Sequence, residues 1–198
     1  MPTTDVAVLM ARARAKQPRF FAAVVADARV TAAYRAERYE FRGRVDALLQ
    51  ALRLAWVSDA FIGQVLYRAQ ARLGALGVPV LPGLAHRLAM MTAQVSIGKP
   101  VVMQPGVYLA HGQVVIDGFV EVRRNTVINP FVTIGLRAGN FRGPKIGEGV
   151  HIGTGAKVIG PVSVGDGAHV GANAVVVDNV AAHSTVVGAP ARPVKRPS

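Results

Sequence analysis

The side chains best suited to chemistry in this sequence are five histidines, because the chain contains no cysteine. The missing cysteine excludes disulfides, thiolate zinc sites and cysteine nucleophiles. Histidine suits proton transfer because its unperturbed pKa is near 6.5, and His111 lies beside a break in a repeat described below. His151 and His169 lie one period of that repeat apart, so we expect them to stack at exposed spacer positions, an interpretation we prefer to a metal site. His86 is predicted to pack in the core, and His183 falls in a closing loop.

A six-residue repeat must position these histidines. Thirteen aliphatic residues recur at steps of six, with one step of seven and one of twelve. They are Ile97, Met103, Leu109, Ile116, Val122, Ile128, Ile134, Ile146, Ile152, Val158, Val164, Val170 and Val176. A second set follows each of them by four residues and is Val, Ala or Thr in twelve of thirteen cases, Gln113 being the exception. A period of six fits neither a helix nor a simple strand, but it fits a solenoid whose triangular coils each take three hexads. So regular a pattern argues against a Val/Gly-rich β-sandwich.

The two irregular steps predict departures from the coil. The step of seven, from Leu109 to Ile116, contains His111, and one extra residue in a regular strand path predicts a bulge. The step of twelve, from Ile134 to Ile146, predicts a loop over 137–145 that leaves the coil.

The first half of the chain has helical spacing, which makes the fold class α+β. We expect a helical domain over 1–94 and a left-handed β-helix with a C-terminal tail over 95–198. The predicted helices cover about 20–30, 45–56, 61–69 and 84–91. Ser58 or Asp59 is expected to cap the third of them. The apolar residues expected to pack are Val45, Leu48, Leu49, Leu52 and Trp56 in the second helix, and Phe61, Ile62, Val65, Leu66 and Ala69 in the third.

Composition narrows the classes of protein. The 198 residues are 51% hydrophobic, which excludes disorder and suits one domain with an appendage. No apolar run reaches the roughly 18 residues of a membrane span, and the N-terminus lacks a signal-peptide pattern, so a cytoplasmic protein is expected. The net charge of +12 is spread along the chain and suits a polyanionic small molecule. Only 6% of residues are aromatic, which argues against a nucleic-acid platform.

Five stretches occur in a set order within the repeat. They are 107–112 (VYLAHG), 132–135 (VTIG), 142–146 (RGPKI), 152–160 (IGTGAKVIG) and 187–192 (VGAPAR). Together they resemble the left-handed β-helix acyltransferases, in particular the serine O-acetyltransferase branch. The resemblance implies transfer of an acetyl group from acetyl-CoA to a hydroxyl, with His111 as the general base that such a weak nucleophile needs. It implies no metal and no nucleic-acid partner.

The chain also departs from that branch. Ser96 stands where serine acetyltransferases have the Asp that orients the catalytic histidine, Ala110 where they have an Asp that holds the serine amino group, and Gly143 where they have a second histidine. Arg142, which meets the substrate carboxylate in that branch, is retained. We expect Arg142, Ala110 and Asn129 to bind the substrate. Without those carboxylates an ammonium group lacks its counter-charge. A neutral hydroxyl on a sugar or small metabolite is therefore the expected acceptor. A serine O-acetyltransferase with an altered pocket and a non-catalytic trimeric scaffold are the alternatives.

The resemblance further implies that acetyl-CoA lies in a groove between neighbouring subunits, with the 137–145 loop reaching over the neighbour's site. The implied cofactor-binding residues are Gly135, Leu136, Thr154, Gly155, Ala172, Arg192 and Lys195. The last two are basic and suit the CoA phosphates, although an ordinary solvated basic tail is an equal alternative. A homotrimer is expected, with a hexamer paired through the N-terminal helices as the alternative.

Overall fold

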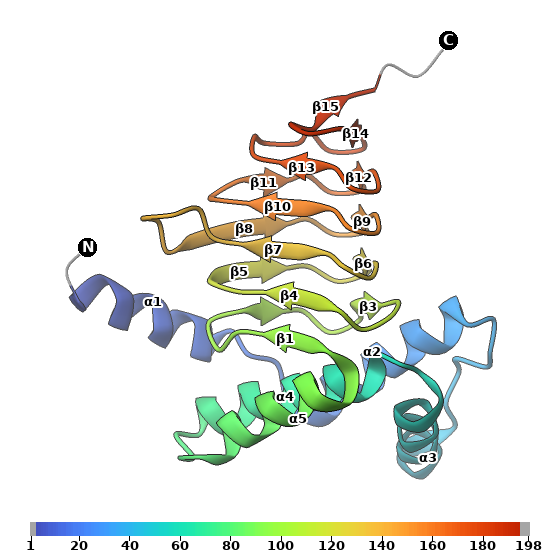
Figure 1. Cartoon of the computed structure of the whole chain (residues 1–198). Helices are drawn as coiled ribbons and strands as arrows, with labels where there is room; N and C mark the ends of the chain where they lie inside the picture. The colour runs from blue at the N-terminus through green and yellow to red at the C-terminus, as the bar shows by residue number, and fades with distance from the viewer. Residues whose placement is uncertain (1–2, 195–198) are drawn as a thin grey trace.

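The computed structural model describes residues 3–194 and consists of five helices followed by a tapering stack of short strands (Figure 1). This is the predicted α+β chain with a left-handed parallel β-helix. The helices are α1 (Thr3–Ala15), α2 (Phe20–Tyr34), α3 (Gly43–Val57), α4 (Phe61–Ala75) and α5 (Leu81–Ala93). Helix α1 was not predicted, and α5 begins earlier than expected because Pro82 lies in its first turn, where proline is tolerated. None of the helices in the described part of the chain has the length and apolar character of a membrane span.

The strands form three parallel sheets, and up to β13 each sheet receives every third strand. The first sheet contains β1 (Val95–Ile97), β4 (Val114–Ile116), β7 (Thr133–Gly135), β10 (Lys157–Ile159) and β13 (Val175–Val176). The second contains β2 (Val102–Met103), β5 (Phe119–Val122), β8 (Arg142–Ile146) and β11 (Ser163–Val164). The third contains β3 (Tyr108–Leu109), β6 (Val127–Ile128), β9 (His151–Ile152), β12 (His169–Val170) and β14 (Thr185–Val187), closed by the antiparallel β15 (Arg192–Pro193). The cross-section of the coil is thus a triangle with three corners.

The hexad positions form the core of this triangle. All thirteen residues of the first set are at most 2% exposed, and eleven of the second set are buried. The two exceptions, Gln113 and Ala138, are exposed and lie at the two irregular steps. At the first of these, the extra residue shifts the inward position by one, to Val114, which is fully buried. The repeat therefore predicted which side chains point inward.

Helix α3 packs by a different face from the predicted one. Its buried residues are Ala47, Ala51 and Leu54. The apolar residues expected to pack are exposed instead, with Val45 at 73% and Trp56 at 91% of their surface. The helix is apolar on two opposite faces, and the small alanines let it approach α2 and α4 closely.

Helix α4 also buries an unexpected face, and this face is polar. Gln64, Tyr67, Arg68 and Gln70 are each at most 2% exposed, because α4 lies across the open end of the coil (Figure 1). Their side chains donate hydrogen bonds to the carbonyls of the first coil. The acceptors are those of Val107 for Gln64, Val101 for Tyr67, Met103 and Gln104 for Arg68, and Ile97 for Gln70. Since an unpaired buried carbonyl costs about 1–3 kcal/mol, the helix stabilises the end of the coil.

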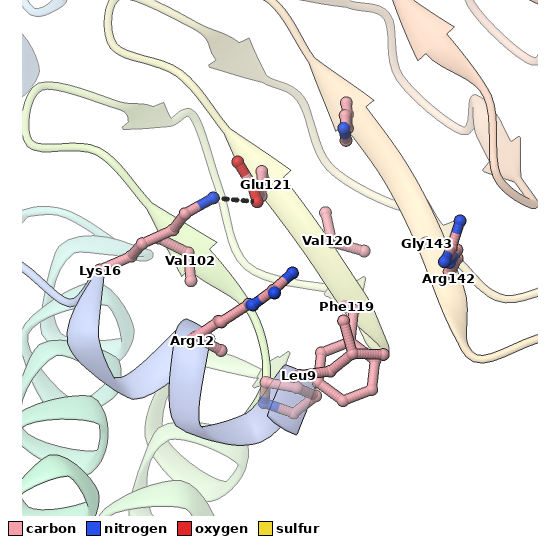
Figure 2. Close-up of a pocket in the computed structure, with 12 residues that line it drawn as sticks. Leu9, Arg12, Lys16, Val102, Phe119, Val120, Glu121, Arg142 and Gly143 are labelled. Carbon is pink, nitrogen blue, oxygen red and sulfur yellow. Dashed lines mark hydrogen bonds and ion pairs between the residues drawn. The ribbon is translucent and has the colours of Figure 1, made fainter. Parts of the chain in front are cut away.

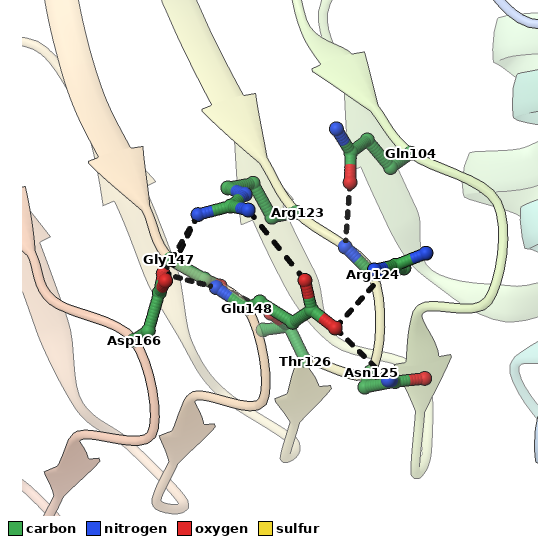
Figure 3. Close-up of polar contacts among 8 residues, drawn as sticks. All are labelled: Gln104, Arg123, Arg124, Asn125, Thr126, Gly147, Glu148 and Asp166. Atoms are coloured by element: carbon green, nitrogen blue, oxygen red, sulfur yellow. Dashed lines mark hydrogen bonds and ion pairs between the residues drawn. The ribbon is translucent and has the colours of Figure 1, made fainter. Parts of the chain in front are cut away.

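The corner between the second and third sheets is held by charged side chains (Figure 3). Arg123 Nη1 donates to both carboxylate oxygens of Asp166, at 2.9 and 3.0 Å. Arg124 Nε donates to Glu148 at 2.9 Å, and the Glu148 amide donates to Asp166 at 2.8 Å. The network joins three successive coils at a corner that carries none of the predicted site residues.

Candidate active site

His111 lies at the corner between the third and first sheets, in the turn from β3 to β4. The register of the strands places this turn beside the one from Ile128 to Val132 in the next coil, and it contains one residue more. The predicted bulge is therefore confirmed. Gly112 is required in it, because a Cβ atom there would overlap the carbonyl oxygen of Ala93 at the end of α5.

The imidazole of His111 is hydrogen-bonded to a carboxylate from the helical part of the chain. Nδ1 lies 2.8 Å from Asp59 Oδ2, and the two side chains are 61% and 72% exposed. Asp59 was predicted only as a possible helix cap, and that prediction is wrong: Ala60 is the N-cap residue of α4, without a side-chain cap. Within residues 3–194, the His111 ring forms its side-chain hydrogen bond with Asp59 and none with Ser96.

The pair lines a hollow of about 420 Å³ between the helices and the coil. Its lining consists of Asp59, Met91, Thr92, Ala93, Gln94, His111, Gly112, Gln113, Pro130 and Phe131. Asp59 and His111 are the two titratable side chains of this lining. With Nδ1 engaged by Asp59, Nε2 is the ring nitrogen left to accept a proton. The arrangement suits a general base that serves a small hydroxyl compound.

Arg142 lies at another corner, between the first and second sheets. It is the first residue of β8 and borders a hollow of about 300 Å³ between α1 and the second sheet (Figure 2). Lys16 of α1 lies in the same hollow and is paired with Glu121 at 2.6 Å. The loop before Arg142 projects from the coil as predicted (Figure 1). It is shorter than 137–145, because 142–145 already belong to β8.

The remaining substrate-binding candidates are parts of the coil. Ala110 is half-buried beside His111, and its amide donates to the Ile128 carbonyl at 3.0 Å. Asn129 lies in the same corner one coil further, where its side-chain amide donates to the Ile152 carbonyl at 2.9 Å. The observed bond of Asn129 thus holds two coils together.

The cofactor-binding candidates divide between two corners. Thr154, Gly155 and Ala172 follow β9 and β12 and so stack above His111, at the corner between the third and first sheets. Gly135 and Leu136 lie at the corner that carries Arg142. Gly135 ends β7 and is buried, although a Cβ atom there would meet nothing closer than 4.0 Å.

The two basic candidates lie near the end of the chain. Arg192 Nη1 donates to Asp178 at 3.0 Å, and its side chain is 63% exposed. Lys195 lies outside the described residues.

His151 and His169 stack as predicted, with ring centroids 5.1 Å apart. Tyr34 of α2 reaches this pair, and its hydroxyl lies 3.5 Å from His151 Nε2. Partial burial and the neighbouring His169 hold the pKa of the His151 imidazole below its usual value. Among the described residues, no group of three or more His, Asp or Glu side chains is placed to hold a metal ion.

Comparison with known proteins finds similar sequences. A family model described as bacterial transferase hexapeptide (six repeats) matches residues 143–178. A serine acetyltransferase of Synechocystis sp. is 40% identical over 133 residues, 66% of this chain and 53% of that protein. The serine acetyltransferase of Escherichia coli K12 is 42% identical over 110 residues, 54% of this chain and 40% of that protein. The chain thus spans about half the length of these relatives.

Solved structures extend the similarity to the helices. The serine acetyltransferase of Vibrio cholerae superimposes with a TM-score of 0.76 at 29% identity, over 100% of this chain and 74% of that one. The soybean serine acetyltransferase apoenzyme gives a TM-score of 0.73 at 30% identity, over 87% of this chain and 67% of that one. The coil and its repeat therefore define a hexapeptide-repeat protein of left-handed β-helix fold. Within that class, the chain belongs to the serine acetyltransferase-like family.

Proposed function

We propose that this protein is an acetyl-CoA-dependent O-acetyltransferase with His111 as its general base. The observation that carries the proposal is the 2.8 Å bond between His111 Nδ1 and Asp59 at the edge of a hollow. The bond leaves Nε2 as the proton acceptor, which is the state a general base needs. Relatives named as serine acetyltransferases support the same chemistry.

The reaction we propose is a direct transfer of the acetyl group. His111 Nε2 takes the proton of the acceptor hydroxyl while the hydroxyl oxygen attacks the thioester carbonyl of acetyl-CoA. The resulting tetrahedral intermediate collapses, the carbon–sulfur bond breaks, and the CoA sulfur leaves with the proton that His111 carried. The products are the acetyl ester of the acceptor and CoA with a free thiol, and the imidazole returns to its neutral form.

The proposed acceptor is a neutral hydroxyl compound, either a sugar or a small metabolite. Of the residues that line the hollow, only Asp59 is acidic, and its carboxylate is engaged by His111. An amino acid's ammonium group would find no second carboxylate there. L-serine is the alternative acceptor, favoured by the names of the relatives.

We propose that the working unit is a homotrimer in which neighbouring subunits complete each other's sites. The site candidates of one chain lie at two different corners of the triangular coil, His111 at one and Arg142 with Gly135 at the other. A cyclic assembly can bring one corner of a subunit against the other corner of its neighbour. The alternative hexamer requires a contact between two trimers, and the exposed apolar face of α3 is suited to form it.

The proposal is tested by thiol release from acetyl-CoA with a panel of L-serine, homoserine, sugars and nucleotide sugars. The protein adds no thiol background, since it has no cysteine. We expect release with one acceptor class, reduced by ~100-fold or more in His111→Ala. Release with L-serine alone would replace the neutral acceptor by the alternative. No release with any acceptor, together with no acetyl-CoA binding by calorimetry, would favour the non-catalytic scaffold.

A further inference from the structure

We propose that Asp59, from the turn between α3 and α4, is the positioning residue for His111. It fixes the imidazole with the proton on Nδ1 and stabilises the positive charge that the ring gains during proton transfer. The inference rests on the proposed function, because it assigns a role toward the general base. It places an essential part of the site outside the coil, on the helices that close its end.

The backbone around Asp59 is anchored although its side chain is exposed. Ser58 before it is 6% exposed, while Ala60 and Phe61 after it are 0% and 1% exposed. Ala60 packs in the core of the coil and Phe61 in the core of the helices. The turn is therefore held on both sides, and the carboxylate is presented from a fixed backbone position, as a site built on rigid elements requires.

The histidine is anchored from the opposite side. Gly112 lies against the Ala93 carbonyl so closely that no side chain fits between them. The amide of Gln94, the next residue, donates to the Met90 carbonyl at 3.1 Å and ends α5. Helix α5 thus sets the position of the His111 turn, while the start of α4 sets the position of Asp59. Since α4 and α5 pack against each other, the same helix pair holds both partners.

Asp59 differs in its partner from three other acids of the helical part. Asp27, Glu37 and Asp46 each pair with an arginine. Asp59 forms its one side-chain hydrogen bond in the described structure with a histidine, and it does not cap α4. Because Asp59 neither caps a helix nor neutralises an arginine, its contact with His111 is the interaction that accounts for a carboxylate at this position.

The consequence for the reaction is a defined tautomer. The Asp59 carboxylate can only accept a hydrogen bond, so Nδ1 must donate and Nε2 must be the basic nitrogen. Without the carboxylate, a neutral imidazole in water prefers the opposite tautomer, which turns a proton donor toward the acceptor. Carboxylates that orient a metal-ligating histidine change affinity or activity by about 10–100-fold when removed, while the buried carboxylate of a catalytic triad is worth about 10⁴-fold. Both side chains here are more than half exposed, so we expect an effect in that range and not the larger loss of a buried triad.

The test compares Asp59→Ala with Asp59→Glu and with the matched control Glu40→Ala, an exposed acid of the helical part outside the hollow. We expect Asp59→Ala to lower kcat by about 10–100-fold with KM near the wild-type value, and Asp59→Glu to recover part of the loss. Glu40→Ala should keep wild-type kcat. A kcat within about twofold of wild type in Asp59→Ala, or an equal fall in Glu40→Ala, would overturn the proposal.

A second readout does not depend on activity. Nitrogen-15 spectra of the histidine-labelled protein at mildly alkaline pH report which ring nitrogen carries the proton, and the His111 signals are those absent from His111→Ala. We expect the Nδ1–H tautomer in wild type and in Glu40→Ala, and a shift toward Nε2–H in Asp59→Ala. An unchanged tautomer in Asp59→Ala would overturn the pairing. If no variant, wild type included, transferred acetyl groups, the proposed function would fail while the tautomer still decided the role of Asp59.

Discussion

The buried ion pair between Arg68 and Asp27 offers the sharpest test of how the helices close the coil. Arg68 is 2% exposed and Asp27 is 1% exposed. Arg68 donates from Nε and Nη2 to the two Asp27 oxygens, at 2.8 and 3.1 Å. It also donates to the carbonyls of Met103 and Gln104, at 2.5 and 2.9 Å. The substitution Arg68→Met keeps an unbranched side chain and removes all four bonds.

The cost follows from what the substitution leaves behind. Asp27 would remain buried without its counter-charge, holding only hydrogen bonds such as that from the Gly106 amide at 2.8 Å. Breaking a buried pair from one side costs about 3–5 kcal/mol. The two freed carbonyls add to this cost, by up to about 1–3 kcal/mol each where water does not reach them. We therefore expect Arg68→Met to lower the free energy of unfolding by at least ~4 kcal/mol.

The measurement is urea unfolding followed by circular dichroism. The matched control is Arg72→Met, an exposed arginine in the last turn of the same helix, which should change stability by less than about 0.5 kcal/mol. In the double variant Asp27→Leu with Arg68→Met, the loss should be smaller than the sum of the single losses. A loss below about 1 kcal/mol in a natively folded Arg68→Met protein would show that the pair does not close the coil, and would refute the reasoning.

Two further predictions concern pH and assembly. Burial and the neighbouring His169 lower the pKa of His151 in the folded protein. The unfolded chain therefore binds a proton on this histidine at a higher pH than the folded chain does. The stability that His151 contributes is complete above its unfolded pKa and is lost as pH falls below about 6.5. Unfolding midpoints at about pH 7.5 and pH 5 should differ less in His151→Gln than in wild type, and an equal difference would contradict the assignment. In a mixed refolding of inactive His111→Ala with inactive Arg142→Ala, neighbouring subunits that share sites should regain about a quarter of wild-type activity, whereas independent sites would regain none.

The coil was predictable because a single rule repeats along it. Each hexad places one aliphatic residue inward, and stacking leaves that residue no other environment, so the pattern is independent of distant contacts. The two irregular steps were informative for the same reason. An extra residue within so regular a path must leave it, and the exposed Gln113 and Ala138 lie where this happens.

The helices were less predictable because their environment comes from elsewhere in the chain. Helix α4 has an apolar stripe by spacing, and Phe61 of that stripe is buried as expected, but Gln64, Arg68 and Gln70 are buried as well. The carbonyl groups at the end of the first coil need hydrogen-bond donors, so a polar helix face is favoured over an apolar one against them. Their positions are defined only once the coil has folded. The bond between Asp59 and His111 joins residues 52 positions apart, and no local pattern in either segment signals it.

These observations explain where this fold can vary its chemistry. The hexad rule restricts inward positions to aliphatic residues, so chemistry has to come from the corners, the outer faces of the strands and the closing helices. The hollow at His111 draws on the corners and the helices: its histidine comes from a corner, while Asp59 and the residues at the end of α5 come from the closing helices. A change in the helical part can then reshape the acceptor site, or supply the orienting carboxylate, without disturbing the repeat that builds the coil. Ser96 is then compatible with an active site, because a carboxylate from the helical part, that of Asp59, reaches the His111 imidazole instead.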